Sequence, residues 1–408
     1  QILARSNRNS LRKEGNKMRR IAIVLCLAAL TALLAGCTGS HEKPCNTEDA
    51  TSVVLVTSPC SNQPSTSSAY LTEIIQSVVN ADGEISVVSA QGKPRVELGA
   101  QRIGSADSST TSREIQNERI VAELTAQVKT LNATTEEIDF LGALSLAYRE
   151  TASMEGPAKI IVCGNGLQTC GLIQFQRGLL EAEPEDVVAY YEAELPDLSG
   201  ASIEWLYCGD TTAPQEELRA SQMSNLRAIW KGLIEASGGS VVFLDENPEG
   251  SEPAAQRPSV SCVSVPSLEP MAVIDDHAQK SISLPNDEVF GFLPDTADLK
   301  DPIAAAEGIR DLVAKYPDIL DASIVVTGHT ASLPTSQDEN LYQLGMKRAQ
   351  AVKEVLVSEG VSPSCISCES RGSLDNLDAN GNPNDLDENG LQIPELAQAN
   401  RKVVVSFE

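Results

Sequence analysis

Cysteines are the side chains with the most obvious chemistry in this chain. The 408-residue sequence holds ten, and two of them, Cys26 and Cys37, lie in or beside an apolar N-terminal stretch. The other eight are Cys45, Cys60, Cys163, Cys170, Cys208, Cys262, Cys365 and Cys368. An even number of cysteines in an exported chain is typical of disulfide bonds, and the sequence leaves their pairing open. We therefore predict disulfides among these eight residues.

The closest pair, Cys365-x-x-Cys368, is compatible with a redox motif, half of a zinc site or a local structural disulfide. We favour the disulfide, because no helix begins at Cys365 that would lower the pKa of a thiol. Zinc would need a second pair of ligands. The chain has three histidines, His41, His277 and His329, and none is paired at metal-ligand spacing. The sequence thus predicts neither a metal nor a cofactor.

An acidic stretch near the C-terminus has part of a calcium-loop pattern. Asp385-Leu-Asp387-Glu-Asn389-Gly390 matches the first half of such a loop. The twelfth position, which should be Glu, is Leu396, and flanking helical patterns are absent. We interpret the stretch as a solvated acidic insertion, with calcium binding as the open alternative.

No set of residues forms a recognisable catalytic group. A Ser-His-Asp arrangement with its nucleophile on a strand-turn-helix is missing. Gly164-Asn165-Gly166 lacks the Lys-Ser/Thr pair of a phosphate-binding loop. His329 stands alone beside a predicted strand end, where a structural role is the usual one. We therefore predict a binding protein and no enzyme.

The candidate residues lie in two regions with different patterns of predicted strands and helices. In the first region, strands and helices alternate. Continuous β-branched or apolar runs predict strands buried on both faces. They cover residues 52–57, 85–88, 159–163, 203–207 and 241–244, and helical patterns cover 70–79, 118–131, 138–151 and 216–237. This alternation predicts a doubly wound α/β domain over residues 51–247. Residues 248–279, rich in Pro and Ser at their start, are predicted to be a linker.

The second region, over residues 280–408, mixes strands with amphipathic helices. Predicted strands are 282–284, 289–292, 324–326, 365–368 and 403–407, the last as an edge or final strand. Predicted helices are 301–315 and 338–358, and Gly360 is placed as the C-cap of the second. This pattern predicts an α+β domain with its helices on one face of a mixed sheet.

The N-terminal stretch has the features of an export signal. Met18-Arg19-Arg20 precedes an apolar run over residues 21–35, too short to span a membrane comfortably. Leu34-Ala35-Gly36-Cys37 resembles a bacterial lipobox. The resemblance implies cleavage before Cys37 and acylation of that cysteine, which would anchor the protein in a membrane. We expect residues 1–36 to be an upstream segment plus lipoprotein signal peptide, and residues 37–50 a linker.

The overall charge excludes several classes of partner. The chain has 31 basic and 57 acidic residues, giving a formal net charge of −26. Such a chain repels polyanions, so nucleic acid is not an expected partner and anionic lipid heads are not either.

The order of motifs in the C-terminal region resembles the C-terminal domain of the outer membrane protein A (OmpA-like) family. It comprises Ile324-Val325-Val326-Thr327-Gly328-His329-Thr330-Ala331, a helix around residues 344–352, Gly360-Val361, Arg371-Gly372 and Asn400-Arg401-Lys402. The family binds peptidoglycan, so the resemblance implies an α+β domain over residues 280–408 that tethers the chain to the cell wall.

The resemblance also implies which residues hold the wall polymer. Arg348 stands at the family's arginine position, where a guanidinium fork would hold the carboxylate of diaminopimelate in the stem peptide. Thr330 and Leu344 keep the family pattern, whereas Ala331 replaces the aspartate that would hold the ammonium. Leu341 replaces the family's asparagine, with Asn340 one place away. Arg401 would either bind ligand or form a structural ion pair.

The N-terminal half is similar to a von Willebrand factor type A domain. The similarity rests on Thr57-Ser58-Pro59-Cys60-Ser61, Thr134-Thr135-Glu136-Glu137-Ile138-Asp139 and Ile161-Val162-Cys163-Gly164-Asn165-Gly166. In that family these places form a metal site, but Thr57 and Gly164-Asn165 stand here where its aspartates belong. Because hard cations prefer carboxylate oxygens, we expect the fold without the metal. Cys60, Cys163, Cys170 and Cys208 lie near predicted strand ends, where disulfides would rigidify this edge.

Two functions follow from these resemblances. The first is a lipid-anchored cell-envelope protein that grips the peptidoglycan stem peptide non-covalently through its OmpA-like domain. The second is an adhesion or assembly protein that acts through residues 51–247 on an unknown protein partner, with a degenerate OmpA-like scaffold. Either protein would be exposed on the extracytoplasmic face, at an outer membrane or a cell membrane.

Overall fold

The computed structural model describes most of the chain beyond its N-terminal segment. The described residues are 51–66, 68–105, 109–246, 257–265, 271–276, 279–287, 289–334 and 338–408. The predictions for the signal peptide, for acylated Cys37 and for Cys45 therefore lie outside the described residues. The chain divides into two units, residues 1–46 and 47–408, and all described residues belong to the second.

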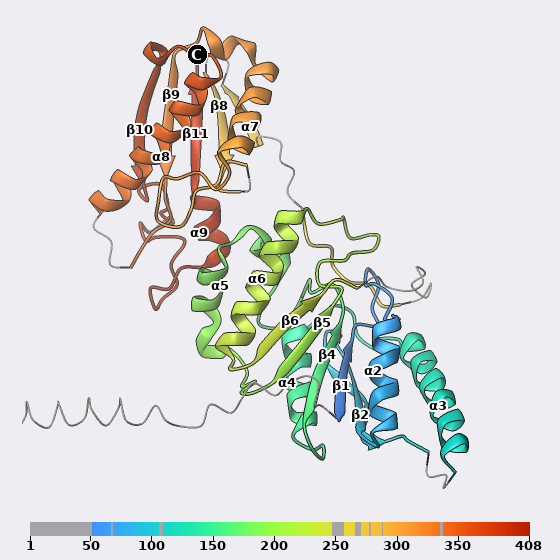
Figure 1. The fold of residues 1–408 in the computed structure, drawn as a ribbon. Coiled ribbons are helices and arrows are strands. Elements are labelled where there is room, and N and C mark those ends of the chain that lie inside the picture. Colours follow the sequence, from blue (N-terminus) through green and yellow to red (C-terminus); the bar gives the residue numbers. More distant parts are fainter. Residues whose placement is uncertain are drawn as a thin grey trace, which may run out of the picture. The chain divides into compact units, whose positions relative to one another are not determined.

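The first sheet has six strands in the order β3-β2-β1-β4-β5-β6 (Figure 1). β1 (Ser52–Thr57) pairs in parallel with β2 (Glu84–Ser89) and with β4 (Ala158–Cys163). β5 (Ser202–Leu206) and β6 (Ser240–Leu244) continue the parallel array. Every residue of β1 is buried, as its continuous β-branched sequence predicted for a central parallel strand. The five strands predicted in this half are all present.

Helices cover both faces of this sheet. α2 (Ala69–Asn80) and α3 (Thr110–Thr130) pack on one face, in a core with the inward side chains of β1 and β2. α4 (Phe140–Thr151) and α6 (Ala220–Ala236) pack with the opposite side chains of β1, β4 and β5. Ser68 and Asp139 cap α2 and α4 by accepting hydrogen bonds from backbone N–H groups. The N-terminal region is therefore α/β with helices on both faces, as predicted.

Apart from short 3-10 turns, one strand and one α-helix described in this half were not predicted. β3 (Arg95–Arg102) adds an antiparallel edge to β2, and all its residues are at least partly exposed. Its many charged and polar side chains hide the strand pattern, since only one face packs on the domain. α5 (Pro184–Tyr191) is a short helix with Pro at its start and Glu185 and Asp186 in its first turn.

The second sheet has five strands in the order β10-β9-β11-β8-β7. Its strands are β7 (Met271–Asp276), β8 (Gln279–Pro285), β9 (Ile324–His329), β10 (Ile366–Gly372) and β11 (Lys402–Phe407). β10 runs parallel to β9, whereas β11 is antiparallel to both β8 and β9. β11 is thus the last strand but a central one, and its edge placement was wrong. Val403, Val405 and Phe407 point from it into the core.

The helices of this half share one hydrophobic core with the sheet. α7 (Pro302–Lys315) contributes Ile309 and Leu312, and α8 (Asp338–Ser358) contributes Val352 and Leu356. Asp301 caps α7 by accepting hydrogen bonds from two backbone N–H groups. Gly360 lies just beyond α8 with φ of +103°, the left-handed conformation that favours glycine at a helix end. A short unpredicted helix, α9 (Pro394–Asn400), precedes β11.

The segment around Phe290 and Phe292 is a turn, although a strand was predicted there. Asp287 accepts hydrogen bonds from the backbone N–H groups of Val289 and Phe290. This side-chain contact folds the backbone back locally, and only Phe292 makes a β-bridge, to Leu299. Both phenylalanines are buried. Their apolar pattern therefore reflects burial in the core, which a turn can provide as well as a strand.

Within residues 248–279, some of the described residues pack against the first sheet and others form part of the second. Val260 and Val263 pack into the core of the first sheet, and Ser61 donates its backbone N–H to the carbonyl of Pro258. β7 belongs to the second sheet. Among the described helices, none is long and apolar enough to cross a membrane.

Candidate functional site

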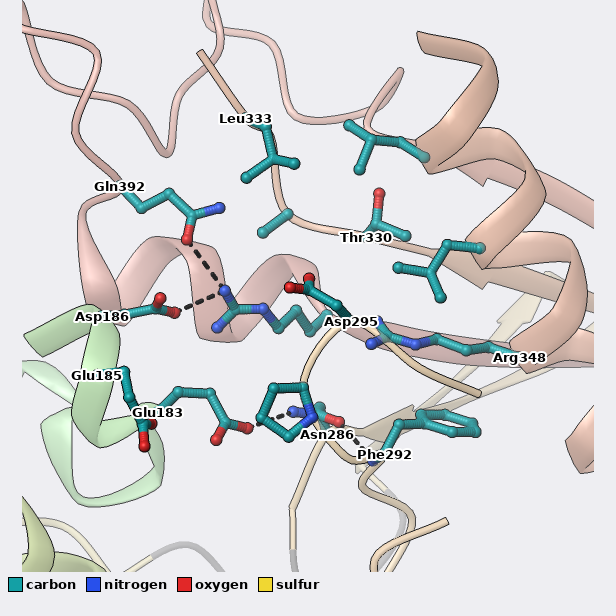
Figure 2. Close-up of a pocket in the computed structure, with 15 residues that line it drawn as sticks. Glu183, Glu185, Asp186, Asn286, Phe292, Asp295, Thr330, Leu333, Arg348 and Gln392 are labelled. Carbon is teal, nitrogen blue, oxygen red and sulfur yellow. Dashed lines mark hydrogen bonds and ion pairs between the residues drawn. The ribbon is translucent and has the colours of Figure 1, made fainter. Parts of the chain in front are cut away.

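A cavity of about 420 Å³ lies at the carboxyl end of β9 (Figure 2). Its walls come from the residues after β9, the first half of α8, the turn after β8, the start of β11 and the first turn of α5. Three of these segments belong to the motifs on which the OmpA-like resemblance rests.

A close approach of α8 to β9 places one wall of this cavity. A Cβ atom added at Gly328 in β9 would overlap the carbonyl oxygen of Gly345 in α8. Only glycine at Gly328 therefore permits this spacing between strand and helix. Arg348 follows Gly345 by about one helical turn. The same contact therefore fixes how close Arg348 lies to the end of β9.

Arg348 is a buried cation, and no described residue forms an ion pair with it. Its side chain is 5% exposed, its Nε donates to the carbonyl oxygen of Thr296 at 2.9 Å, and its guanidinium carbon lies 5.1 Å from the centre of the Phe292 ring. Burial, followed by the neighbouring charge of Arg401, lowers the pKa of Arg348 to about 10. The group therefore stays charged at neutral pH, and no carboxylate forms an ion pair with it among the described residues.

Arg401 also lines the cavity, but its charge is already matched. Its Nη2 donates to Asp186 of α5 at 2.6 Å and to Gln392 at 3.1 Å, contacts that appear as dashed lines in Figure 2. Its Nη1 is buried and has no hydrogen-bond partner in the described part of the chain. Of the two roles expected for Arg401, the structure therefore contains the structural ion pair.

Thr330 and Ala331 form the floor beside Arg348. Thr330 donates its backbone N–H to the carbonyl of Gly372 at 2.9 Å, and its side-chain oxygen is buried with no partner among the described atoms. Ala331 is buried and brings no charge. A carboxylate entering beside Arg348 would therefore meet two kinds of donor, a guanidinium and a hydroxyl.

The remaining residues of the expected site divide into two groups. Leu341 and Leu344 line the cavity with apolar side chains. Asn340 is exposed on α8 and is not part of the lining. The structure thus brings together Arg348, Thr330, Ala331, Leu344 and Arg401, and it leaves Asn340 outside.

Four carboxylates around the cavity were missed by the sequence interpretation. Glu183 accepts hydrogen bonds from Lys300 at 2.9 Å and from Asn286 at 3.3 Å, and Asp186 holds Arg401. Glu185 and Asp295 are exposed and have no ion-pair or hydrogen-bond partner among the described residues. The α5 acids lie far from the site in sequence, and no local signal marks them. Asp295 lies in Leu293-Pro294-Asp295-Thr296, a turn-like sequence. Only the fold shows that this turn reaches the cavity.

The acidic insertion supports the floor of the cavity. Asp385 is fully buried and accepts hydrogen bonds from the backbone N–H of Ser332 at 2.9 Å and from Asn376 at 3.3 Å. The prediction of a solvated insertion is therefore wrong for Asp385. Asp378, which is exposed, and Asp387, which is partly exposed, fit this prediction better. Each accepts hydrogen bonds from backbone N–H groups of its own turn.

His329 is the last residue of β9, directly before Thr330, and it does not line the cavity. A structural role was expected for it. It is 8% exposed, and its Nδ1 lies 3.6 Å from Asp375. Burial, followed by the charge of Lys402, lowers the pKa of His329 below its ordinary value of 6.5. The imidazole is therefore mainly neutral at pH 7.

The carboxyl edge of the first sheet is filled by amide side chains. Asn165 donates its backbone N–H to Gln63 at 3.0 Å and its side-chain amide to the carbonyl of Asn62 at 3.1 Å. Thr57 is buried beside them, and its hydroxyl has no partner among the described atoms. No group of three His, Cys, Asp or Glu that could hold a metal occurs in the described ranges.

The seven described cysteines are free thiols, contrary to the predicted disulfides. Cys163 and Cys208 pack in different hydrophobic cores, on the two faces of the first sheet, so they cannot pair. Cys60 and Cys170 each direct their sulfur toward a backbone carbonyl, of Glu137 and Gly92. Burial raises the pKa of Cys60 and Cys163 to about 12 and that of Cys170 to about 11. These thiols are therefore protonated at neutral pH and poorly reactive.

Cys365 and Cys368 also remain apart. Cys365 ends a short 3-10 turn that spans Pro363–Cys365, and Cys368 lies within β10. Cys368 packs at the margin of the second core. Cys368 lies opposite Val326 in the regular pairing of β10 with β9. Cys365 and Cys368 are both free thiols, so the predicted local disulfide is absent.

A comparison with known protein families gives one match, in the C-terminal part of the chain. Residues 291–390 match the OmpA family, and no curated protein matches the chain. Among solved structures, the periplasmic domain of Helicobacter pylori MotB (residues 78–256) is 24% identical, with a TM-score of 0.25, over 32% of this chain and 76% of that one. The cell wall anchor of the type VI secretion system of Pseudomonas aeruginosa is 21% identical, with a TM-score of 0.26, over 33% and 85%. The peptidoglycan-associated lipoprotein of Burkholderia pseudomallei is 22% identical, with a TM-score of 0.22, over 31% and 89%.

The family match spans most of the segments that form the cavity. It covers the turn with Phe292 and Asp295, the strand end with Thr330 and Ala331, and Arg348 on α8. Arg401 and α5 lie outside the match. The chain therefore contains an OmpA family domain at residues 291–390.

Proposed function

We propose that this protein binds peptidoglycan non-covalently through the cavity beside Arg348, with the carboxylate of a stem-peptide residue held by the guanidinium. The observation that carries the proposal is a buried, charged arginine that lacks a counter-anion among the described residues. Burying a cation without an anion costs several kcal/mol. A ligand carboxylate that forms a two-point contact with the guanidinium removes this cost on binding.

The test is co-sedimentation of the full-length protein, kept in mild detergent, with insoluble peptidoglycan. Arg348→Ala should weaken binding at least tenfold, because a hydrogen bond to a charged group contributes about 1.5–3 kcal/mol. Arg348→Lys keeps the charge without the fork and should bind at an intermediate level.

Arg310→Ala is the matched control for this test. Arg310 is a mostly exposed arginine on α7 that pairs with Glu359 at 3.0 Å and does not line the cavity. Its loss should leave binding unchanged. Equal binding by the unsubstituted protein and Arg348→Ala would refute the proposal.

Membrane attachment through acylated Cys37 completes this function as a proposal. It rests on the lipobox-like sequence Leu34-Ala35-Gly36-Cys37, and it would place the domain on the extracytoplasmic face of an outer or cell membrane. Metabolic labelling with a radioactive fatty acid tests it, since Cys37→Ser should abolish the label. A label that survives the substitution would contradict acylation at this residue.

The alternative function is adhesion or assembly through residues 51–247. Ala331 favours it, because the cavity lacks a charge at the place where the family pattern has an aspartate. In that case the von Willebrand A-like half would bind a protein partner that the sequence does not identify. Absence of peptidoglycan binding by the unsubstituted protein would favour this alternative. In neither function do we propose catalysis.

A further inference from the structure

The two edges of the first sheet differ in sequence and in regularity. β3 forms one edge and β6 forms the other (Figure 1). β3 carries Arg95, Glu97 and Arg102, and its pairing with β2 shifts register at two places. Charges and bulges of this kind keep other strands from pairing with an exposed edge. The β3 edge is therefore protected against association with another chain.

β6 has none of these protective features. Its sequence, Ser240-Val241-Val242-Phe243-Leu244, carries no charge, and it pairs with β5 in an unbroken register. Val242 at its centre is 56% exposed, although it is apolar and β-branched. Of the described strands, only β5 pairs with β6, so the backbone groups on its other side are available to a further strand. β6 is thus an open apolar edge.

Helix α6 places charged side chains beside this edge. The guanidinium carbon of Arg227 lies 5.8 Å from the centre of the Phe243 ring, and its Nη2 lies 2.8 Å from the carboxylate of Asp245. Arg227 therefore flanks the carboxyl end of β6. Lys231 and Glu235 follow at intervals of four residues and pair with each other at 3.9 Å. Because α6 ends shortly before β6 begins, Glu235 lies toward the start of the strand.

We propose that β6 pairs with the β6 strand of a second copy of this chain, antiparallel and centred on Val242, so that the two sheets form one continuous sheet. Val242 would lie opposite its counterpart. Val241 would lie opposite Phe243, and pairs of β-branched and aromatic residues stabilise antiparallel strands. The two-fold symmetry makes this a closed dimer. The proposal is independent of the function proposed above.

The charges favour a second copy in the antiparallel orientation. Arg227 of each copy would lie at the same end of the interface as Glu235 of the other. Asp245 would lie opposite the uncharged Gly239 of the other copy. A parallel pair would instead place Asp245 against Asp245 and Arg227 against Arg227, and like charges repel. Pairing between β6 and the β3 strand of another copy is opposed by the charges and the irregular register of β3.

The experiment exchanges charges at the centre of the interface. Two full-length copies with different affinity tags are co-expressed, dissolved in an excess of mild detergent and purified through one tag, and recovery of the second tag measures the dimer. Val242→Lys in both copies should lower this recovery about tenfold, and so should Val242→Glu in both, because like charges directly opposite each other destabilise paired strands. Val242→Lys in one copy with Val242→Glu in the other should restore recovery, since the opposed charges then attract.

Ile115→Lys is the matched control. Ile115 is an apolar residue on α3 that is 60% exposed, and α3 packs over β1 and β2, away from the β6 edge. Its substitution should leave recovery of the second tag unchanged.

Three results would overturn the dimer. The first is unchanged recovery in both like-charged combinations. The second is a Lys–Glu combination that fails to restore recovery, because the two copies would then not meet at Val242. The third is an absence of co-purification by the unsubstituted chains, which would leave the β6 edge to another segment or to a different protein.

Discussion

Arg348 combines a structural cost, the burial of its charge, with the binding role that we propose for it. Its guanidinium lies over the Phe292 ring and donates a hydrogen bond to the carbonyl of Thr296, so the side chain is held in place before any ligand arrives. Its position was predicted from the OmpA-like resemblance. Asp295 was not predicted to line the cavity, because its place there depends on how the turn around it folds. Asp186 was not predicted either, since it reaches Arg401 from a segment 215 residues away in sequence.

His329 provides a pH prediction at the residue scale. Its pKa is lower in the folded chain than its ordinary value of 6.5, so the folded state binds this proton less readily. Its neutral form therefore stabilises the fold above pH 6.5, and this contribution is lost as the pH falls from 6.5 through the lower folded pKa.

The measurement is urea unfolding of the protein and of His329→Gln over this pH range. The unsubstituted protein should lose stability on acidification more steeply than the variant does. Asp375, Lys402 and Arg371 surround the imidazole and are kept in both proteins, so the difference isolates the histidine. Parallel pH profiles for the two proteins would contradict the account.

At the scale of elements, the spacing between β9 and α8 sets the geometry of the cavity. The sequence predicted both elements, because a buried apolar strand and a long amphipathic helix leave clear periodic patterns. It could not give the central place of β11, since strand order depends on pairing between residues far apart in sequence. β3 escaped prediction because its polar exposed face breaks the apolar pattern, and α5 because it is short.

Gly328→Ala tests the role of this spacing. The added methyl group would collide with the backbone of Gly345, so we expect a loss of about 1–3 kcal/mol in the free energy of unfolding. Because α8 must shift, Arg348 should shift with it and peptidoglycan binding should weaken. Gly99→Ala in β3 is the control, since nothing lies within 4 Å of a Cβ atom added there. Stability and binding equal to the unsubstituted protein for Gly328→Ala would contradict the close approach.

At the scale of the whole molecule, the net charge of −26 opposes general adhesion to an anionic wall polymer. The proposed binding to peptidoglycan therefore requires a local site whose attraction exceeds this long-range repulsion. Salt screens charges over a Debye length of about 10 Å at 0.1 M, and it screens buried pairs much less. Salt therefore weakens the repulsion from the acidic surface much more than it weakens an ion pair at the buried guanidinium.

This difference predicts the salt dependence of binding. Raising NaCl from about 0.05 M to about 0.5 M should leave the affinity for peptidoglycan within about threefold, or raise it, because the screened term is mainly repulsive. Sedimentation assays at several salt concentrations measure the trend. A steep loss of affinity would indicate adhesion by exposed basic residues in place of the cavity.

The most direct test of the central claim is a calorimetric titration of the full-length protein with a soluble muropeptide that carries diaminopimelate. The account predicts saturable binding at one site, which is lost in Arg348→Ala and retained in Arg310→Ala. No binding by the unsubstituted protein, or equal binding by Arg348→Ala, would contradict it.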